Sequence, residues 1–327
     1  MPPLPRRPLL AALLAAPGLA PGLARAQATW PSQPVRLVLP YAAGGPTDII
    51  ARLIADALSQ RLPQRVVVEN RTGAGGNIGA SAVAKSRPDG GTFLFTNTGH
   101  AVNRALYARL DYDPAKDLTP VTIVAESPMV LLVPNSSPAR TLAEFVERVR
   151  AQPGAFSYGS TGTGGALQLV SLLLLKAAGL RMEEVPYRGS APAAQDLIAG
   201  RIEMLYDAGA TAFPLATGGQ ARALVVSSAQ RSAVMPAVPT VGEAGFPAAT
   251  FSVWQGILAP TGTPEPIITR LRDEVASLLG DGPLRARLTE LGAERIVANT
   301  PAEARAYVEA EMTRWEAVLR DAGVQPQ

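Results

Sequence analysis

The chain contains no cysteine and a single histidine, His100, among its 327 residues. The absence of cysteine excludes disulfides and thiolate chemistry, although an oxidising compartment would be tolerated. A zinc centre would have to rely on carboxylates without a second histidine. A Ser-His-Asp hydrolase would need His100 as its base, and Ser160 stands in Gly-Ser-Thr-Gly rather than in the Gly-x-Ser-x-Gly pattern. The single histidine therefore argues against several enzyme classes. We expect a protein that is not an enzyme and that needs no metal and no cofactor.

Long apolar runs are scarce, and the start of the chain holds one of export type. An arginine pair precedes the apolar residues 9–16, and small residues follow up to Ala24-Arg25-Ala26. This order is typical of a secretory signal peptide, so we expect residues 1–26 to be removed after about Ala26. Two prolines break the run well short of the roughly 20 apolar residues that a membrane span needs. The expected location is periplasmic, by the Sec or the twin-arginine route.

An excess of charge is also lacking once this leader is set aside. The whole chain has 30 Lys and Arg residues against 27 Asp and Glu residues. The leader contains Arg6, Arg7 and Arg25 and no acidic residue, so the remainder balances 27 basic with 27 acidic residues. No basic footprint for nucleic acid remains, and we expect no nucleic-acid partner.

Short apolar runs alternate with amphipathic helical patterns along the rest of the chain. Strands are predicted at Val35–Leu39, Arg65–Asn70 and Thr92–Thr96, and later at Met129–Pro134 and Ser252–Ala259. Helical patterns lie between them, the first at Thr47–Arg61, with Ile50, Leu53, Ile54, Ala57 and Leu58 on one stripe. Such alternation predicts an α/β fold with mostly parallel sheets covered on both faces.

A small-residue loop between the first strand and the first helix is the leading candidate for a binding site. A helix that begins after a glycine turn presents free amide groups and partial positive charge, which suits a carboxylate or phosphate. The loop contains no Lys or Arg, so its backbone would have to hold the anion. An ordinary turn, with Thr47 as helix N-cap and Asp48 in the first turn, is the simpler alternative. The candidate ligand-binding residues are Tyr41, Ala42, Ala43, Gly44, Gly45, Thr47 and Asp48.

A second loop of the same kind, Tyr158–Gly165, lies more than one hundred residues later. Two such loops facing each other would form a cleft lined by amide donors. The candidate ligand-binding residues of this second loop are Ser160, Thr161, Thr163, Gly164 and Gly165. A third candidate segment ends the strand at Thr96 and contributes Thr96, Thr98 and His100, unless it is only a polar loop that caps the next helix. Arg188 could supply a cation, although such an arginine is more often a solvated or structural one.

The ordered motifs of the chain resemble the periplasmic receptors of tripartite tricarboxylate transport systems, the Bordetella uptake gene family. The similarity covers nearly all of the chain after the leader. The matching stretches are Trp30-Pro31, residues 34–40, 44–52, 66–79 and 85–90, Ala105-Leu-Tyr107, residues 111–114, 158–160 and 185–192, Pro239-Thr-Val-Gly-Glu-Ala-Gly245 and residues 258–264.

The resemblance implies a type II periplasmic binding protein fold, with a small carboxylate in a cleft between two α/β domains joined by crossing strands. We expect domain 1 at residues 27–128 plus 252–327 and domain 2 at residues 129–251. The resemblance also implies a membrane transporter as partner, and we expect the receptor to be monomeric. Gln168 stands near a position where the family often has histidine and is therefore a further candidate ligand-binding residue. Asp207 matches an acidic position of the second domain, where it would favour an ammonium, hydroxyl or water, or would instead cap a helix at 210–217.

Two other functions remain open at the level of sequence. Gly73-Ala-Gly-Gly-Asn-Ile-Gly79 imitates a dinucleotide-binding turn, but its glycines follow G-x-G-x-x-x-G, and no acidic residue ends a strand about 20 positions later. These glycines are better explained by a tight turn and close packing. A sensor subunit that signals to a membrane kinase would need the same cleft as a transport receptor.

Overall fold

The computed structural model describes residues 30–280, 282–321 and 326. The predicted signal peptide lies outside these described residues. None of the helices within the described ranges is long and apolar enough to cross a membrane.

The first lobe is a parallel α/β unit. Strand β1 (Val35–Leu39) pairs in parallel with β2 (Val66–Asn70) on one side and with β3 (Thr92–Asn97) on the other. Helix α1 (Pro46–Ser59) connects β1 to β2, and the turn η1 (Ala74–Gly76) with helix α2 (Asn77–Ala84) connects β2 to β3. Helix α3 (Gly99–Leu106) follows β3. Each strand therefore delivers the chain to a helix N-terminus at the same edge of the sheet.

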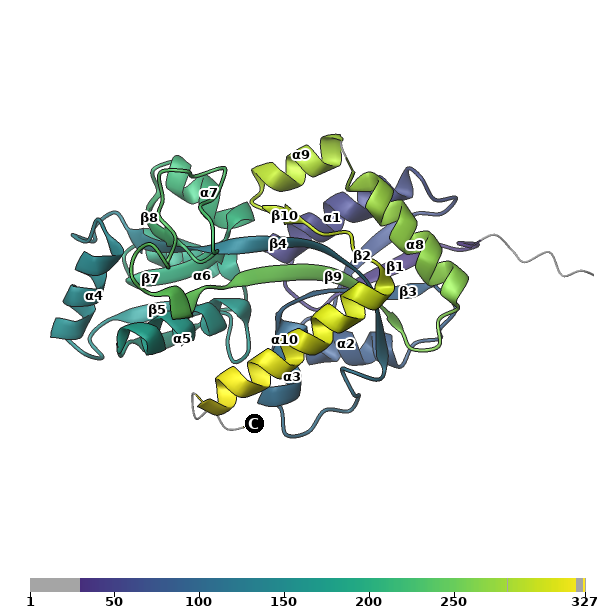
Figure 1. Cartoon of the computed structure of the whole chain (residues 1–327), viewed down its shortest axis with the longest axis horizontal. Coiled ribbons are helices and arrows are strands. Elements are labelled where there is room, and N and C mark those ends of the chain that lie inside the picture. The colour runs from purple at the N-terminus through teal and green to yellow at the C-terminus, as the bar shows by residue number, and fades with distance from the viewer. Residues whose placement is uncertain (1–29, 281, 322–325, 327) are drawn as a thin grey trace, which may run out of the picture.

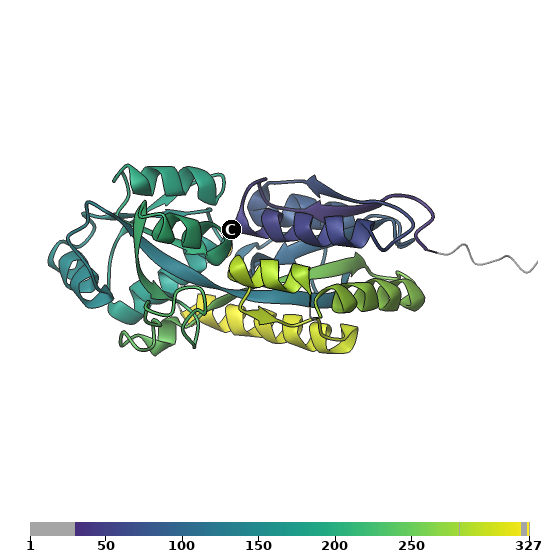
Figure 2. The same ribbon diagram turned by 90° about the horizontal axis from the view of Figure 1, so that it is seen from above.

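Two long antiparallel strands connect the two lobes. Strand β9 (Ser252–Pro260) lies between β3 and β4 (Leu118–Pro134), antiparallel to both. The later half of β4 continues into the second lobe, where it pairs with other strands. Figure 1 shows β4 and β9 running side by side across the middle of the molecule, and Figure 2 shows β4 crossing between the lobes in a second view.

The second lobe repeats the parallel arrangement. Strand β5 (Ser157–Ser160) lies between β6 (Glu183–Pro186) and β7 (Met204–Ala208), and β8 (Ala221–Val226) pairs with β4. The helices are α4 (Leu142–Ala151), α5 (Ala166–Ala178), α6 (Ser190–Ile198) and α7 (Gly209–Thr217), followed by the short turn η2 (Pro247–Ala249). The main path of the resulting 10-stranded sheet is β2-β1-β3-β9-β4-β7-β5-β6.

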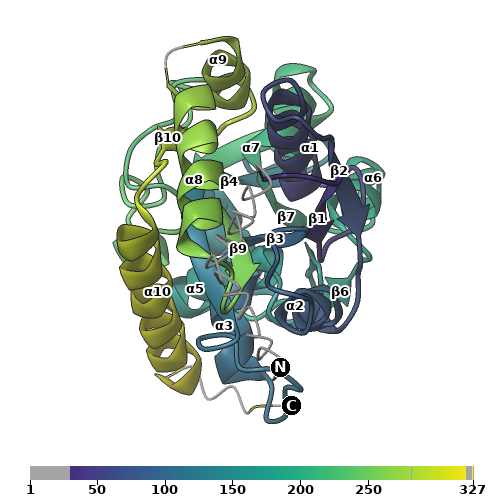
Figure 3. The same cartoon turned by 90° about the vertical axis from the view of Figure 1, so that its right-hand side faces the viewer.

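The C-terminal segment returns along one flank of the sheet. It comprises α8 (Glu265–Leu278), α9 (Pro283–Glu290), β10 (Arg295–Ile296) and α10 (Pro301–Asp321). Figure 3 shows α8 and α10 on the same side of the molecule. Trp315 of α10 packs edge-on against Phe251, with ring centroids 5.5 Å apart. Because Phe251 precedes β9, this contact fastens the last helix to the connection between the lobes.

The predicted α/β class is confirmed, and most predicted elements lie within two residues of the observed ones. The main correction concerns β4, which begins at Leu118 although the sequence predicted a strand only from Met129. Pro120, Glu126 and Pro128 interrupt the apolar pattern of the earlier half. The strand forms there because β9 supplies antiparallel pairing along it, with register shifts after Pro120 and Ile123.

Candidate ligand-binding cleft

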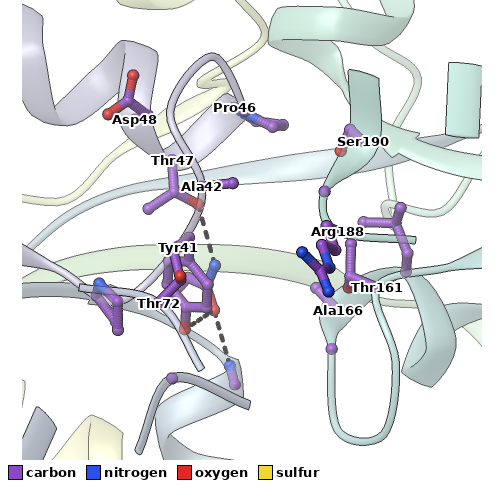
Figure 4. A pocket seen from close by; sticks show the side chains of 18 of the residues that line it. Tyr41, Ala42, Pro46, Thr47, Asp48, Thr72, Thr161, Ala166, Arg188 and Ser190 are labelled. Carbon is purple, nitrogen blue, oxygen red and sulfur yellow. Dashed lines mark hydrogen bonds between the residues drawn. The ribbon is translucent and has the colours of Figure 1, made fainter. Parts of the chain in front are cut away.

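A cavity of about 510 Å³ lies between the lobes at the carboxyl ends of the parallel strands. This is the position at which open α/β sheets bind ligands, because several helix N-termini converge there. Figure 4 shows Tyr41, Ala42 and Thr47 on one side, and Thr161, Arg188 and Ser190 on the opposite side. The volume suits a small organic molecule.

The loop after β1 forms one wall, and its shape is set by a buried carboxylate. Gly45 is the N-cap of α1 and Pro46 is its first residue, so the alternative with Thr47 as N-cap is wrong. Proline fixes the first helical φ without losing a needed amide, and the Thr47 hydroxyl instead accepts a hydrogen bond from Asn97 Nδ2 at 3.0 Å. The Gly44 amide donates to Asp48 Oδ2 at 3.0 Å.

Asp48 fastens this wall rather than facing a ligand as a free charge. It is 2% exposed and accepts hydrogen bonds from Arg52 Nε at 2.9 Å and Asn70 Nδ2 at 2.9 Å. Burial alone would raise the pKa of its carboxyl group, but the hydrogen bonds from Arg52, Gly44 and Asn70 outweigh burial and lower it. The carboxylate therefore stays ionised and neutralised.

The loop after β5 forms the opposing wall with the same construction. Gly165 is the N-cap of α5, and the Gly164 amide donates to Gln168 Oε1 at 2.8 Å. Gln168 Nε2 donates in turn to Glu184 Oε2 at 2.8 Å, and Ser160 Oγ donates to Glu184 Oε1 at 2.5 Å. Gln168 and Ser160 thus lie behind the cavity lining and hold the loop in place.

Two further helix N-termini face the cavity, and the sequence prediction did not include them. One is the glycine turn before α2, where Gly73, Ala74, Gly75 and Gly76 all have positive φ. The other is the start of α6, from Gly189 to Pro192. Both follow a parallel strand through a small-residue turn, which is the signal that marked the predicted loops. The first turn had been attributed to packing, and Gly79 does pack closely, since a Cβ there would lie 2.8 Å from the Arg71 carbonyl oxygen.

The floor of the cavity is a row of side chains along the crossing strands. Asn97 of β3 lies opposite Gln255 of β9, and Met129 of β4 lies opposite Ala208 of β7. These four residues and Val253 all line the cavity. Directly opposite residues of antiparallel strands point to the same face, so the floor runs from one lobe to the other.

Arg188 and Asp48 are the charged side chains of the lining. Asp48 is already paired with Arg52. Arg188 is exposed and forms no ion pair with an acidic side chain in the described part of the chain. Figure 4 places its guanidinium on the second-lobe side of the cavity. The cleft therefore carries a net positive character from one arginine and several helix N-termini.

Thr96, Thr98 and His100 are placed beneath the lining rather than in it. Thr98 Oγ1 accepts a hydrogen bond from the Trp254 amide at 3.1 Å, and Thr96 Oγ1 lies 3.3 Å from the Tyr41 hydroxyl. His100 is 2% exposed, and burial lowers the pKa of its imidazole to about 4. The histidine is therefore neutral at ordinary pH and packs in the interior.

Asp207 lies just behind the second wall and is not a helix cap. Its Oδ1 accepts from Ser190 Oγ at 2.9 Å and from the Ala208 amide at 2.8 Å, whereas the N-cap of α7 is Ala208. Burial raises the pKa of its carboxyl group to about 6, although these hydrogen bonds oppose the increase. Asp207 joins β7 to the start of α6 and so positions Ser190, which does line the cavity.

The two lobes come close to each other at two glycines of the second lobe. A Cβ on Gly189 would lie 3.5 Å from Ala42 Cβ, and a Cβ on Gly164 would lie 2.2 Å from Leu106 Cδ1. A side chain at the second position would force Leu106 to shift. These glycines allow the lobes to approach each other closely.

The cavity brings together many of the predicted residues and adds others. The predicted residues in its lining are Tyr41, Ala42, Ala43, Gly45, Thr47, Asp48, Thr161, Gly164, Gly165 and Arg188. The predicted residues outside its lining are Gly44, Thr96, Thr98, His100, Ser160, Thr163, Gln168 and Asp207. Lining residues that the sequence did not single out include Thr72, Asn97, Met129, Tyr187, Ser190, Val253 and Gln255.

Comparison with known proteins agrees with a two-lobed binding protein. The family model described as the tripartite tricarboxylate transporter family receptor matches residues 50–324. The structure of R. palustris Rpa4515 with adipate is 39% identical, with a TM-score of 0.88, over 91% of this chain and 100% of that one. MatC from Rhodopseudomonas palustris with bound malate is 36% identical, with a TM-score of 0.82, over 89% and 100%. The periplasmic binding protein BugD is 33% identical, with a TM-score of 0.87, over 91% and 100%.

The fold and the cleft thus define a two-domain α/β binding protein. The chain belongs to the tripartite tricarboxylate transporter receptor family. This is a family of solute-binding receptors and not of enzymes, which confirms the prediction from the residues.

Proposed function

We propose that the protein is a periplasmic receptor that captures a small carboxylate between its lobes for a tripartite tricarboxylate-type transporter. The observation that carries the proposal is Arg188, a cation in the cavity lining that has no acidic partner among the described residues. Several helix N-termini open onto the same cavity. Similar proteins of known structure hold adipate and malate. A guanidinium and convergent amides together recognise carboxylate oxygens through charge-assisted hydrogen bonds.

The proposed mechanism is closure of the lobes on the ligand. A carboxylate that contacts both walls binds the closed arrangement better than an open one and shifts the population toward it. The closed surface would then be the one presented to the membrane partner. Bending of β4 and β9 would allow the movement. The proposed domain boundaries at residues 128/129 and 251/252 lie side by side in these strands, because Pro128 pairs with Ser252.

Calorimetric titration of the protein without its leader tests the proposal. The panel comprises acetate, succinate, malate, adipate, citrate, aspartate and nicotinate. We expect saturable binding of at least one acid, and Arg188→Gln should weaken it by about tenfold or more because a charge-assisted hydrogen bond is lost. Arg140→Gln is the matched control, since Arg140 is exposed and does not line the cavity.

Two results would contradict the proposal. Absence of binding by every acid in the panel would remove the carboxylate function. Equal affinity of the Arg188→Gln and Arg140→Gln variants would show that the ligand binds away from this wall.

A further inference from the structure

Gln255 is a buried amide in the cavity lining that the protein leaves without partners. It lies in the middle of β9, is 0% exposed and lines the cavity. Neither its Nε2 nor its Oε1 has a hydrogen-bond partner among the described residues. Buried polar groups in folded proteins are almost always hydrogen-bonded, because an unpaired one is unfavourable. An unpaired amide on a residue that borders a cavity therefore points to a group that a ligand supplies.

The neighbouring amide, Asn97, shows the contrast. It lies opposite Gln255 in the sheet, and all of its hydrogen bonds in this region serve the fold. Its Oδ1 accepts from the Tyr41 hydroxyl at 2.7 Å and from the Gly99 amide at 2.9 Å, and its Nδ2 donates to Thr47. Asn97 thus holds the first wall in place, whereas Gln255 has a donor and an acceptor that no described residue satisfies.

A primary amide has a donor and an acceptor side by side, which determines the group that it matches. A bare carboxylate offers only acceptors and would leave Oε1 facing a negative oxygen. A carboxyl group with a hydroxyl on the next carbon offers both: the hydroxyl donates to Oε1 and a carboxylate oxygen accepts from Nε2. An ammonium in place of the hydroxyl is disfavoured because Arg188 lines the same cavity and the Asp48 carboxylate is already paired with Arg52.

We infer that Gln255 is the specificity-determining residue of the cleft and selects 2-hydroxy carboxylates over unsubstituted ones. This inference rests on the proposed function, since Gln255 can select only among carboxylates that the cleft binds. It goes further because it names the chemical class of the ligand and assigns the selection to a residue of the crossing strand β9 rather than to either loop.

Malate and succinate are the probes, because they differ only by one hydroxyl group, and aspartate replaces that hydroxyl with an ammonium. The unmodified protein should bind malate about tenfold or more tightly than succinate, with aspartate weaker than malate. In Gln255→Met, which preserves side-chain length, malate should fall to about the affinity of succinate, while succinate binding changes by no more than about twofold. In Gln255→Glu, a negative charge at the floor should weaken both diacids.

Gln195→Met is the matched control, because Gln195 is exposed on α6 and does not line the cavity. Thermal melting of each variant establishes that it is folded. An unchanged malate-to-succinate ratio in Gln255→Met, or unchanged affinities in Gln255→Glu, would overturn this inference while leaving the proposed function in place. Absence of binding by every carboxylate to the unmodified protein would overturn both.

Discussion

Gly44 and Gly164 occupy equivalent places in the two lobes. Their φ angles are +81° and +78°, and each immediately precedes the N-cap glycine of a helix. Each donates its amide to the side chain four residues later, Gly44 to Asp48 at 3.0 Å and Gly164 to Gln168 at 2.8 Å. The resemblance between the two loops in the sequence is therefore a shared local structure, with one loop on each wall of the cleft.

The two glycines differ in what lies beyond them, and this difference gives a matched pair of variants. A Cβ at Gly44 meets nothing within 4 Å, whereas a Cβ at Gly164 would lie 2.2 Å from Leu106 Cδ1 in the first lobe. Both alanine variants should lose about 1 kcal/mol of unfolding free energy, because alanine is strained in the left-handed region. Only Gly164→Ala should also weaken ligand binding, by about tenfold, because it obstructs the approach of the lobes.

Urea denaturation and calorimetric titration of the two glycine variants measure these effects separately. Leu106→Ala provides a further check, since it makes room for the added methyl group and should restore part of the affinity of Gly164→Ala. Equal affinities of Gly44→Ala and Gly164→Ala would contradict the assignment of Gly164 to the closing contact.

Asp48 should be a stabilising residue whose effect depends on pH. Asp48→Ala removes the acceptor of the Gly44, Asn70 and Arg52 hydrogen bonds, so we expect a loss of about 2 kcal/mol of unfolding free energy at neutral pH. Since the pKa of Asp48 is lowered by folding, its contribution is present above the ordinary value of 3.8 and is lost as the pH falls below it. The difference between wild type and variant should therefore shrink in acid.

Chemical denaturation at pH 7 and at pH 3 tests this dependence. Asp56→Ala is the control, because Asp56 is an exposed residue of the same helix. A stability difference for Asp48→Ala that stays constant with pH would show that the carboxylate charge does not matter.

Asp207 should have the opposite effect on stability. Its pKa is raised from 3.8 to about 6 by burial, so the folded state binds a proton more tightly than the unfolded state. The ionised group therefore costs stability above pH 6, and the cost disappears as the pH falls toward 3.8. Asp207→Asn retains an acceptor for Ser190 and Ala208, and it should be more stable than wild type by roughly 2 kcal/mol at pH 8, with equal stability near pH 4.

Denaturation of wild type and Asp207→Asn across this pH range gives the difference directly. Subtracting the two curves also removes the contribution of His100, whose lowered pKa destabilises the folded state as the pH falls from 6.5 toward 4. A stability difference that grows in acid would mean that Asp207 is ionised and satisfied in the folded protein.

Prediction from sequence was most accurate where the signal was local. The stripe of Ile50 and Ile54 identified α1, and the glycines at 44, 45, 164 and 165 identified both loops as strand-to-helix turns. Prediction failed for the first half of β4, because its prolines and Glu126 hide a strand that β9 stabilises from more than one hundred residues away.

By itself the sequence determined the alternation of strands and helices, the glycine turns that begin the helices, and the membership of a receptor family. Only the tertiary structure decided which of those turns share a cavity, because the sheet order places β1, β2, β5 and β6 so that their carboxyl ends face one space. The same holds for Gln255, which is one polar residue in an apolar run when read along the chain. Its significance depends on the absence of a partner for its amide among the described residues, and the packing of distant strands determines that.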